Sequence, residues 1–501
     1  MVVGPQFKKT SLIDFMTNTT LNVPNWVGGK LCSTETWLEK FNPHNGSTLS
    51  FFSNSSLQDA TSAVDVAELA FPEWSELTPV HRGEVLGEIS RAMRQRTSEL
   101  AHCVALETGK SLSHAKGEVS AAILQAEYYA GEGMRMFGRT LPSVVLGKTS
   151  YTVRQPHGIA ALIVPANTPI ANIAWKVFPA LICGNTIVLK SSEDAPRTAT
   201  LFAEICEQAG LPAGVLNVVH GHGSVVGAAL VNDPRINVVS FTGSTSVGRT
   251  IAEAAGRRLA RVSLELGGKN SLVVCDDAEL DLAAHWAALS AFSNAGQRCA
   301  AGSRIVVFDS IYEEFSERLI EKVSRLKLGI SDDCDLGPVI SKRHQLRILE
   351  MISVARSSGG RLLTGGVAPR DKILSRGFYV EPTLLDEIPL SNNICQSEIF
   401  GPVATLHRVS NIQDALTVAN DTQYGLTASV HTRNIDRALW FTQRVRAGVA
   451  NVNLGTYGSE PHMPFGGFGI SGNGTREPGV EALDVYSELK NISMLTRHNL
   501  T

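Results

Sequence analysis

A thiol and a carboxylate, Cys299 and Glu265, carry the most informative chemistry of this sequence and lie 34 residues apart. A thiolate captures a carbon electrophile, and a carboxylate can then activate the water that releases the bound acyl group. Arg298 directly precedes the cysteine, and we expect its positive charge to lower the pKa of the thiol. Gly267 and Gly268 follow Glu265 and permit a tight backbone path that turns its side chain into a cleft. Together these residues predict a two-stage acyl reaction, although taken alone a cysteine is more typical of a buried structural thiol and a glutamate of a surface charge.

An amide side chain, Asn167, can supply the oxyanion donor that such a reaction needs. It follows an apolar run at residues 159–164 that is typical of a buried strand. Ligands of open α/β sheets bind beyond the carboxyl ends of the strands, where an amide can donate to a developing oxyanion. The alternative is turn chemistry, because asparagine is common in turns.

Two further segments indicate a dinucleotide site. Residues 241–248 join an expected strand to a helix, and the unpaired N–H groups of a helix N-terminus suit a pyrophosphate. Gly243 and Gly248 have Gly-x-x-x-x-Gly spacing rather than Gly-x-Gly-x-x-Gly, so this signal is weak alone. Lys190 and Glu193 follow an expected strand at 186–189 and can bind a ribose, with surface charge as the alternative.

The elements that position these residues change character along the chain. Helical spacing predicts helices over 60–71, ended by Pro72, and over 82–109 and 113–137. Strands are then expected at 159–164, 186–189, 215–219 and 237–241, with helices at 196–209 and 223–231. This alternation predicts a parallel, Rossmann-like sheet. After Glu265 the alternation restarts, with expected strands at 271–274, 304–308 and 449–452 and helices at 280–294, 312–326, 342–357, 411–420 and 436–445.

Composition excludes several classes of function. The 501 residues carry a net charge of −3, which does not favour nucleic acid or an anionic membrane as a partner. No two of the eight cysteines are closer than 23 residues, so we expect no metal site and a reducing, cytoplasmic location. Residues 1–21 lack a secretory pattern, and the apolar stretch 158–189 contains prolines and polar residues that disfavour a membrane span.

Taken together, the ordered segments closely resemble the aldehyde dehydrogenase superfamily from about residue 25 to residue 495. They are residues 165–169, 190–193, 241–248, 265–269, 296–299, 398–403, 464–467 and 471–472. The resemblance implies an α/β, aldehyde dehydrogenase-like fold with a Rossmann-type dinucleotide-binding domain, an α/β catalytic domain and an oligomerisation arm. The implied boundaries are 20–137 and 152–264 for the NAD(P)-binding domain, 265–468 for the catalytic domain, and 138–151 and 480–501 for the arm. Family members are homodimers or homotetramers, and we expect the same here.

The resemblance also implies a role for each matching residue. Cys299 attacks the aldehyde, Asn167 and the Cys299 N–H hold the oxyanion, and Glu265 activates the water that hydrolyses the thioester. Lys176 and Glu477 match a proton path behind the site. The positions implied to bind the cofactor are Val164, Pro165, Lys190, Glu193, Phe241, Thr242, Gly243, Ser244, Val247, Leu266, Glu398 and Phe400. A glutamate at 193 favours NAD, with NADP as the other possibility.

Arg298 is the clue to the substrate. An arginine at this position recurs in branches of the family that oxidise semialdehydes, and residues 453–465 look most like the 2-oxoglutarate-semialdehyde branch. A guanidinium binds a carboxylate through two hydrogen bonds, so we expect an ω-aldehydo acid held by Arg298 or His462, with Phe465 at the site. The alternatives are an uncharged aldehyde, a coenzyme A-acylating enzyme, against which Glu265 argues, and a non-catalytic structural relative.

Overall fold

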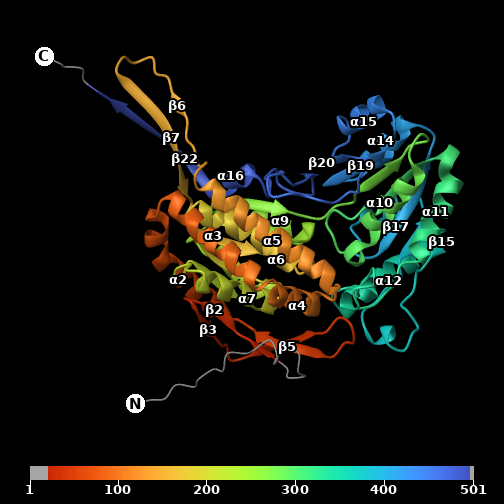
Figure 1. Ribbon diagram of the computed structural model, residues 1–501, viewed down its shortest axis with the longest axis horizontal. Helices are drawn as coiled ribbons and strands as arrows, with labels where there is room; N and C mark the ends of the chain where they lie inside the picture. Colours follow the sequence, from red (N-terminus) through yellow and green to blue (C-terminus); the bar gives the residue numbers. More distant parts are fainter. Residues whose placement is uncertain (1–20, 497–501) are drawn as a thin grey trace.

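Two seven-stranded sheets form the body of the chain (Figure 1). The structure is a computed structural model and describes residues 21–496. Residue 20 and residues 497–501, which the sequence assigns to the first domain and to the arm, lie outside the described residues.

The first sheet is mostly parallel, with helices on both faces. Its spatial order is β12 (Arg261–Glu265), β11 (Ile236–Thr242), β8 (Ile159–Ile163), β9 (Thr186–Lys190), β10 (Leu216–Val219), β2 (Asn25–Val27) and β3 (Lys30–Cys32). One face packs on α3 (Pro79–Gln95), α4 (Thr97–Thr108), α5 (Leu112–Glu132), α6 (Pro169–Ile182) and α7 (Pro196–Gln208). The other packs on α2 (Leu57–Glu76), α8 (Ala228–Asn232) and α9 (Thr245–Arg257). Since both faces are covered, β8 is buried along its whole length, which explains its unbroken apolar run.

The order of this sheet creates a crevice beside β8. Strands β9 and β10 follow β8 on one side of it, and the next strand in sequence, β11, pairs with the other side of β8. The loops that follow β8 and β11 therefore diverge at a topological switch point, where open α/β sheets bind ligands. These loops carry Asn167 and Gly243.

The second sheet lies beside the first and has its own helices (Figure 1). Its spatial order is β15 (Arg361–Thr364), β16 (Thr383–Asp386), β17 (Val403–Val409), β14 (Arg304–Phe308), β13 (Ser271–Val274), β19 (Thr427–His431) and β20 (Val449–Val452). The helices around it are α10 (Leu280–Phe292), α11 (Tyr312–Ser324), α12 (Lys342–Ser357), α14 (Ile412–Asn420) and α15 (Ile435–Thr442). Only residues 266–270 connect β12 to β13, so the carboxyl end of the first sheet meets the amino end of the second.

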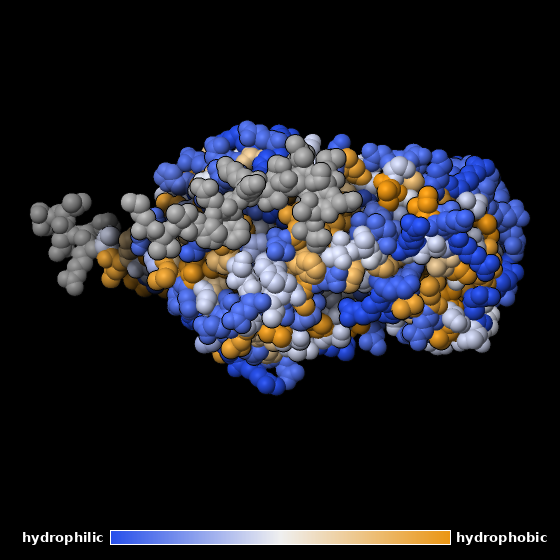
Figure 2. Space-filling view, turned by 90° about the horizontal axis from the view of Figure 1, so that it is seen from below, coloured by the Kyte–Doolittle hydropathy of each residue, from blue (hydrophilic) through white to orange (hydrophobic). Residues whose placement is uncertain are grey.

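A three-stranded arm projects from the body (Figure 1). It consists of β6 (Thr140–Leu141), β7 (Lys148–Pro156) and β22 (Ser487–Leu495), the last of which follows α16 (Leu483–Tyr486). The arm exposes large apolar side chains, and Figure 2 shows apolar atoms where it leaves the body. A separate small sheet contains β1 (Leu21–Val23), β5 (Thr48–Ser53) and β4 (Trp37–Phe41). No helix within residues 21–496 has the length and apolar character needed to cross a membrane.

The expected end of the first helix at Pro72 is wrong, because α2 continues to Glu76. Pro72 and Glu68, whose carbonyl loses its helical partner, are both exposed, so water can satisfy that group. Trp74 is fully buried beyond the proline and anchors the last turn.

The helix expected over residues 82–109 is in fact two helices. The backbone of Arg96, at φ −103° and ψ 20°, separates α3 from α4. Most other expected elements are confirmed within a few residues, and β13, β14, β20 and α12 match their expected ranges.

Candidate active site

A pocket of about 810 Å³ lies between the two sheets and contains the predicted nucleophile. This volume is typical of a small-molecule site. The predicted residues that line it are Pro165, Asn167, Thr242, Gly243, Ser244, Leu266, Arg298, Cys299, Glu398, Phe400 and Phe465. The predicted residues that do not line it are Val164, Lys176, Lys190, Glu193, Phe241, Val247, Glu265, His462 and Glu477.

A strained turn presents Cys299 to this pocket. After α10 the chain passes through three consecutive residues with positive φ: Asn294 at 55°, Ala295 at 53° and Gly296 at 68°. A Cβ at Gly296 would lie 2.1 Å from the Gly401 carbonyl oxygen, so the approach of these two backbone segments requires glycine. Such backbone strain is a recurrent feature of functional sites.

The thiol of Cys299 is less acidic than the sequence predicts. Burial, followed by the charges of Glu398 and Glu265, raises its pKa to about 12. Arg298 lowers the pKa as expected, but its effect is smaller than the sum of the others. The expectation of a lowered pKa is therefore wrong, because it left out the burial of the thiol, which is the largest effect, and the charge of Glu398.

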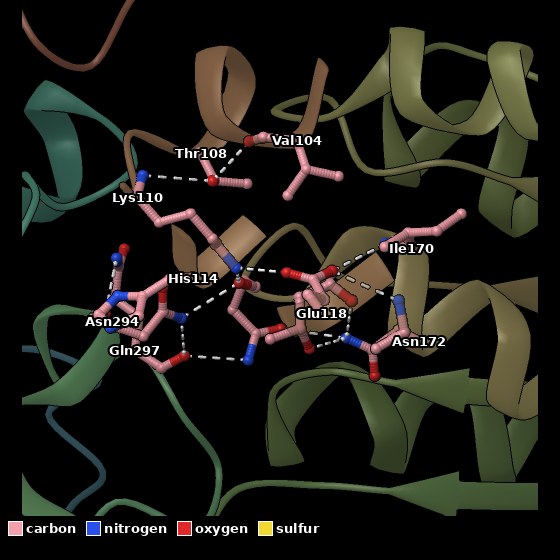
Figure 3. A network of polar contacts seen from close by, with 12 residues as sticks. Val104, Thr108, Lys110, His114, Glu118, Ile170, Asn172, Asn294 and Gln297 are labelled. Carbon is pink, nitrogen blue, oxygen red and sulfur yellow. Dashed lines mark hydrogen bonds and ion pairs between the residues drawn. The ribbon is translucent and has the colours of Figure 1, made fainter. Parts of the chain in front are cut away.

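The amide of Asn167 is held beside the nucleophile loop, whose residues Asn294 and Gln297 are labelled in Figure 3. Its Nδ2 donates to the Gln297 carbonyl oxygen at 2.9 Å, two residues before Cys299. Asn294 Nδ2 donates to the Asn167 carbonyl oxygen at 3.1 Å and to the Gln297 carbonyl oxygen at 3.2 Å. Within residues 21–496 the Nδ2 of Asn167 donates no other hydrogen bond, and Asn167 lines the pocket, so its second hydrogen is available to a ligand there.

Glu265 ends β12 directly behind the pocket. The side chain is buried, and neither carboxylate oxygen has a hydrogen-bond partner among the described residues. Burial, followed by the charge of Glu477, raises its pKa well above the usual range, and Lys176 and Arg476 oppose this effect. A Cβ at Gly466 would lie 2.8 Å from Glu265 Oε1, so the glycine makes room for the carboxylate. A buried carboxyl with a raised pKa and free oxygens is suited to general acid–base chemistry.

A buried ion pair lies next to Glu265. Lys176 Nζ is 2.8 Å from Glu477 Oε2 and donates to Ser240 Oγ at 2.8 Å. The second carboxylate oxygen, Oε1, accepts hydrogen bonds from Ser240 at 2.8 Å, Ser263 at 3.2 Å and the Tyr486 hydroxyl at 3.3 Å. Sequence resemblance predicted this pair, and the fold brings its two members together across 301 residues of chain.

Glu398 enters the pocket against two glycines. Gly268 N–H donates to Glu398 Oε1 at 3.3 Å, and a Cβ at Gly267 would lie 2.3 Å from Glu398 Oε2. Burial raises the pKa of Glu398 to about 7. Phe400 adopts a positive φ of 56°, and its carbonyl oxygen lies 2.6 Å from His344 Nε2.

The helix that follows Gly243 fits a dinucleotide phosphate. Helix α9 has no side-chain cap at Ser244, so its first N–H groups are free of that partner. A Cβ at Gly243 would lie 2.4 Å from the ring of Phe241, which accounts for the glycine. Phe241 and Val164 are buried, and Val247 is exposed on the first turn of α9.

Lys190 and Glu193 differ in how they are held. Lys190 is buried, its Nζ donates to the Ser191 carbonyl oxygen at 2.7 Å, and burial lowers its pKa to about 8. Glu193 is partly exposed and accepts from Gly223 N–H at 3.1 Å, with His222 Nδ1 also at 3.1 Å. Surface charge is therefore an adequate description of Glu193 but not of Lys190.

Arg298 and His462, the two expected carboxylate anchors, are placed differently. Arg298 lines the pocket with its guanidinium carbon 4.7 Å from the centre of the Tyr457 ring. Its Nε is buried without a hydrogen-bond partner, and no acidic residue within 21–496 forms an ion pair with it. His462 is exposed, lies 4.0 Å from Glu460 and does not reach the pocket.

Sequence reasoning missed several residues of the pocket. Trp175 packs against Phe465 with ring centres 5.4 Å apart, and Tyr457 belongs to the same apolar cluster around Cys299. Lys110 and Glu118, which form a buried ion pair, also line the pocket. Trp175 directly precedes Lys176, so its place in the sequence could have indicated that it lies near the site. Nothing in the sequence around Lys110 or Glu118 gives a similar indication.

The comparisons with known proteins agree on the family of the chain. The model of the aldehyde dehydrogenase family matches residues 30–492. An alpha-ketoglutaric semialdehyde dehydrogenase of Bacillus subtilis is 40% identical over 88% of this chain and 91% of its own length. The NADP-dependent succinate-semialdehyde dehydrogenase of Escherichia coli is 37% identical over 90% of this chain and 92% of its own. The solved structure of PnpE from Pseudomonas sp. WBC-3 has a TM-score of 0.93 at 35% identity and covers 96% of this chain and 99% of PnpE. PnpE has also been solved in complex with nicotinamide adenine dinucleotide.

Proposed function

Because the chain belongs to the aldehyde dehydrogenase family and is an NAD(P)-dependent aldehyde dehydrogenase, we propose that its substrate is an ω-aldehydo acid. The product is the corresponding dicarboxylic acid, and NAD is the cofactor. The family supports the reaction, and the charge of the pocket supports the substrate.

The observation that carries the substrate proposal is the free guanidinium of Arg298. It lies in the pocket of Cys299, stacks on Tyr457, and has no acidic partner within residues 21–496. A partly buried cation without a counter-ion is costly, so an anionic ligand is favoured there. A substrate with its aldehyde at Cys299 and its carboxylate at Arg298 supplies that charge. The relationship to semialdehyde dehydrogenases gives the same indication.

The proposed chemistry begins at Cys299. Its sulfur attacks the aldehyde carbon, while the free Asn167 Nδ2 hydrogen and the Cys299 N–H donate to the oxygen that becomes negative. Because the thiol pKa is raised, the attacking thiolate forms by loss of the thiol proton to solvent, and Glu265 keeps its two free carboxylate oxygens for the later hydrolysis. Glu265 then activates the water that hydrolyses the thioester, and Lys176 and Glu477 transfer protons behind it.

A dinucleotide bound in this pocket would supply the acceptor for the hydride that leaves the substrate carbon. The chain would hold it with Thr242, Gly243, Ser244 and the free N–H groups of α9, and with Glu398 and Phe400 at the nicotinamide ribose. Glu193 is fixed by Gly223 and His222, and its charge would repel a 2′-phosphate. We therefore propose NAD over NADP, and initial rates with each cofactor test this choice.

The substrate proposal predicts a preference that depends on Arg298. Wild type should oxidise 2-oxoglutarate semialdehyde with a kcat/KM about 10- to 100-fold above that for an uncharged aldehyde of equal length, since a charge-assisted bond contributes about 1.5–3 kcal/mol. Arg298→Ala should lose this preference and keep its activity on the uncharged aldehyde. His462→Ala, whose side chain lies outside the pocket, should retain the preference. An acid preference that survives Arg298→Ala contradicts the proposal.

The second candidate is an enzyme for uncharged aldehydes. Trp175, Phe465 and Tyr457 form an apolar wall beside Cys299, and such a wall favours an aromatic or aliphatic chain. A higher kcat/KM for the uncharged aldehyde in wild type would favour this candidate. Acyl-coenzyme A formed on adding coenzyme A, or activity unaltered in Cys299→Ala, would instead indicate the acylating and non-catalytic alternatives.

We also propose that the arm pairs copies of the chain into a homodimer or homotetramer. Val144, Leu146, Leu489 and Leu495 on the arm are more than half exposed, and burial of such apolar area drives association. Light scattering of wild type and of Leu489→Lys tests this assembly. All eight cysteines are free thiols, which supports the cytoplasm as the proposed location.

A further inference from the structure

Two buried residues that Figure 3 labels, Lys110 and Glu118, are in contact with each other, and the lysine also contacts the backbone of Asn167. Lys110 lies between α4 and α5, and its Nζ contacts Glu118 Oε2 and donates to the Asn167 carbonyl oxygen at 2.9 Å. Glu118 Oε1 accepts from the N–H groups of Ile170 at 3.0 Å and Ala171 at 3.3 Å, which belong to the first turn of α6. The pair therefore ties α5 to both ends of the short segment between Asn167 and α6.

The side chain of Asn167 is oriented by a second contact. Asn172, one turn into α6, donates from Nδ2 to Asn167 Oδ1 at 3.2 Å and to the Thr168 carbonyl oxygen at 3.0 Å. Since an amide oxygen accepts and an amide nitrogen donates, this contact fixes which end of the Asn167 amide faces the nucleophile loop. The Nδ2 end then points to Gln297.

We propose that the Lys110–Glu118 pair and Asn172 are positioning residues that hold the Asn167 amide where the oxyanion forms. The proposal rests on the oxyanion role given to Asn167 above. It extends that role to three side chains that do not touch the reacting atoms.

The burial of the pair supports a positioning role over a purely stabilising one. Both side chains are 5% exposed, and apolar residues of similar size often stabilise such a site equally well or better. A charged pair offers what apolar packing lacks, a directed hydrogen bond to the Asn167 carbonyl oxygen and a carboxylate at the positive end of α6. Preorganised donors of this kind lose their effect when displaced by about 1 Å.

A double-mutant cycle on the NADH burst tests the proposal. Asn167→Ala should slow the burst about 10²- to 10³-fold, as loss of one oxyanion donor does. Lys110→Met should slow it about 10- to 100-fold. The double variant should be no more than about threefold slower than Asn167→Ala, because the lysine acts only through the amide.

A second readout separates positioning from general damage to the site. Alkylation of Cys299 by iodoacetamide displaces iodide and forms no oxyanion, so its rate should be the same in Lys110→Met and wild type. Arg197→Met removes one member of another largely buried ion pair, Arg197–Glu204, outside the pocket, and should keep the wild-type burst. If Lys110→Met does not fold, Asn172→Ala enters the same cycle with the same expectation.

The outcomes distinguish the two proposals. If Asn167→Ala is slow but the Lys110 or Asn172 effect multiplies with it, the positioning role is wrong and the oxyanion role stands. If Asn167→Ala has a wild-type burst, the oxyanion role itself is wrong, and the positioning role with it. A slowed burst with altered alkylation in Lys110→Met also overturns the positioning role.

Discussion

Two buried lysine–glutamate pairs lie along helix α6, and they differ in what surrounds them. Lys110–Glu118 lies at the start of the helix, and Lys176–Glu477 includes a residue from its middle. Side-chain exposure is 5% for both members of the first pair and 1% and 0% in the second. The residue types and the burial are therefore alike.

The difference lies in the third partner of each pair. Lys110 donates to a backbone carbonyl oxygen and Glu118 accepts from backbone N–H groups, so that pair is linked to groups that do not titrate. Glu477 is surrounded by hydroxyl groups and acts on the pKa of Glu265. The Lys110–Glu118 pair can therefore fix the geometry of the site, and the Lys176–Glu477 pair can take part in proton transfer. This difference follows from the neighbours of each pair rather than from its residue types.

The largest effect is expected from replacing Glu265, whose pKa the Lys176–Glu477 pair influences. Glu265→Gln should lower the steady-state kcat by about 10²- to 10³-fold, because the thioester loses its general base. The NADH burst should persist at about one equivalent per site, since hydride transfer precedes hydrolysis. Stopped-flow absorbance measures both phases.

This result would separate the two pairs by step, since Lys110→Met is expected to slow the burst itself. Asn167→Ala serves as the reference with a slow burst. A Glu265 variant that folds normally but shows no burst would contradict this assignment of the two pairs to different steps. Glu265 would then act at or before hydride transfer.

A smaller effect is expected on the pH dependence of kcat. Glu477 raises the pKa of Glu265 and Lys176 lowers it, so Glu477→Gln should lower that pKa and Lys176→Met should raise it. The base works when deprotonated, so the rising limb of kcat against pH should move to lower pH in Glu477→Gln and to higher pH in Lys176→Met. Profiles that move in the same direction would contradict the electrostatic coupling.

Both variants leave a buried charge without its partner, which costs about 3–5 kcal/mol of folding free energy. The Tm of each variant is therefore measured by thermal unfolding, and the pH profiles of kcat are compared at a temperature below the lowest Tm. Lys110→Met removes a lysine of similar burial and should leave the limb where it is in wild type.

The sequence predicted one pair and not the other, for a physical reason. Lys176 and Glu477 were found through resemblance, and Cys299, Asn167 and Glu265 were found through local pattern. Lys110 and Glu118 stand among helical residues, and nothing local shows that α5 packs against the start of α6. Burial of a charge depends on contacts between distant segments, so a single sequence predicts it poorly.

The same limit bears on the wrong expectation for the thiol pKa and on the choice of His462. The pKa of Cys299 depends on burial and on Glu398, 99 residues away, whereas only Arg298 is adjacent in sequence. His462 was chosen by its neighbours in sequence, but its side chain lies outside the pocket. The sheets were easier to predict, because a strand covered on both faces is marked by an unbroken apolar run, as in β8.

The smallest expected effect concerns the pKa of the Cys299 thiol. Glu398, which belongs to neither of the two pairs, raises this pKa. The pKa of Glu398 itself is about 7. Glu398→Gln removes that negative charge, lowers the thiol pKa and increases the thiolate fraction. Without cofactor, iodoacetamide should therefore alkylate the variant a few-fold faster than wild type above pH 7 and equally fast below it, where Glu398 is already neutral. Glu193→Gln removes a partly exposed carboxylate that does not line the pocket, and it should match wild type throughout. Equal rates for Glu398→Gln and wild type at every pH would contradict the effect of Glu398 on the thiol pKa and leave burial and Glu265 as its causes.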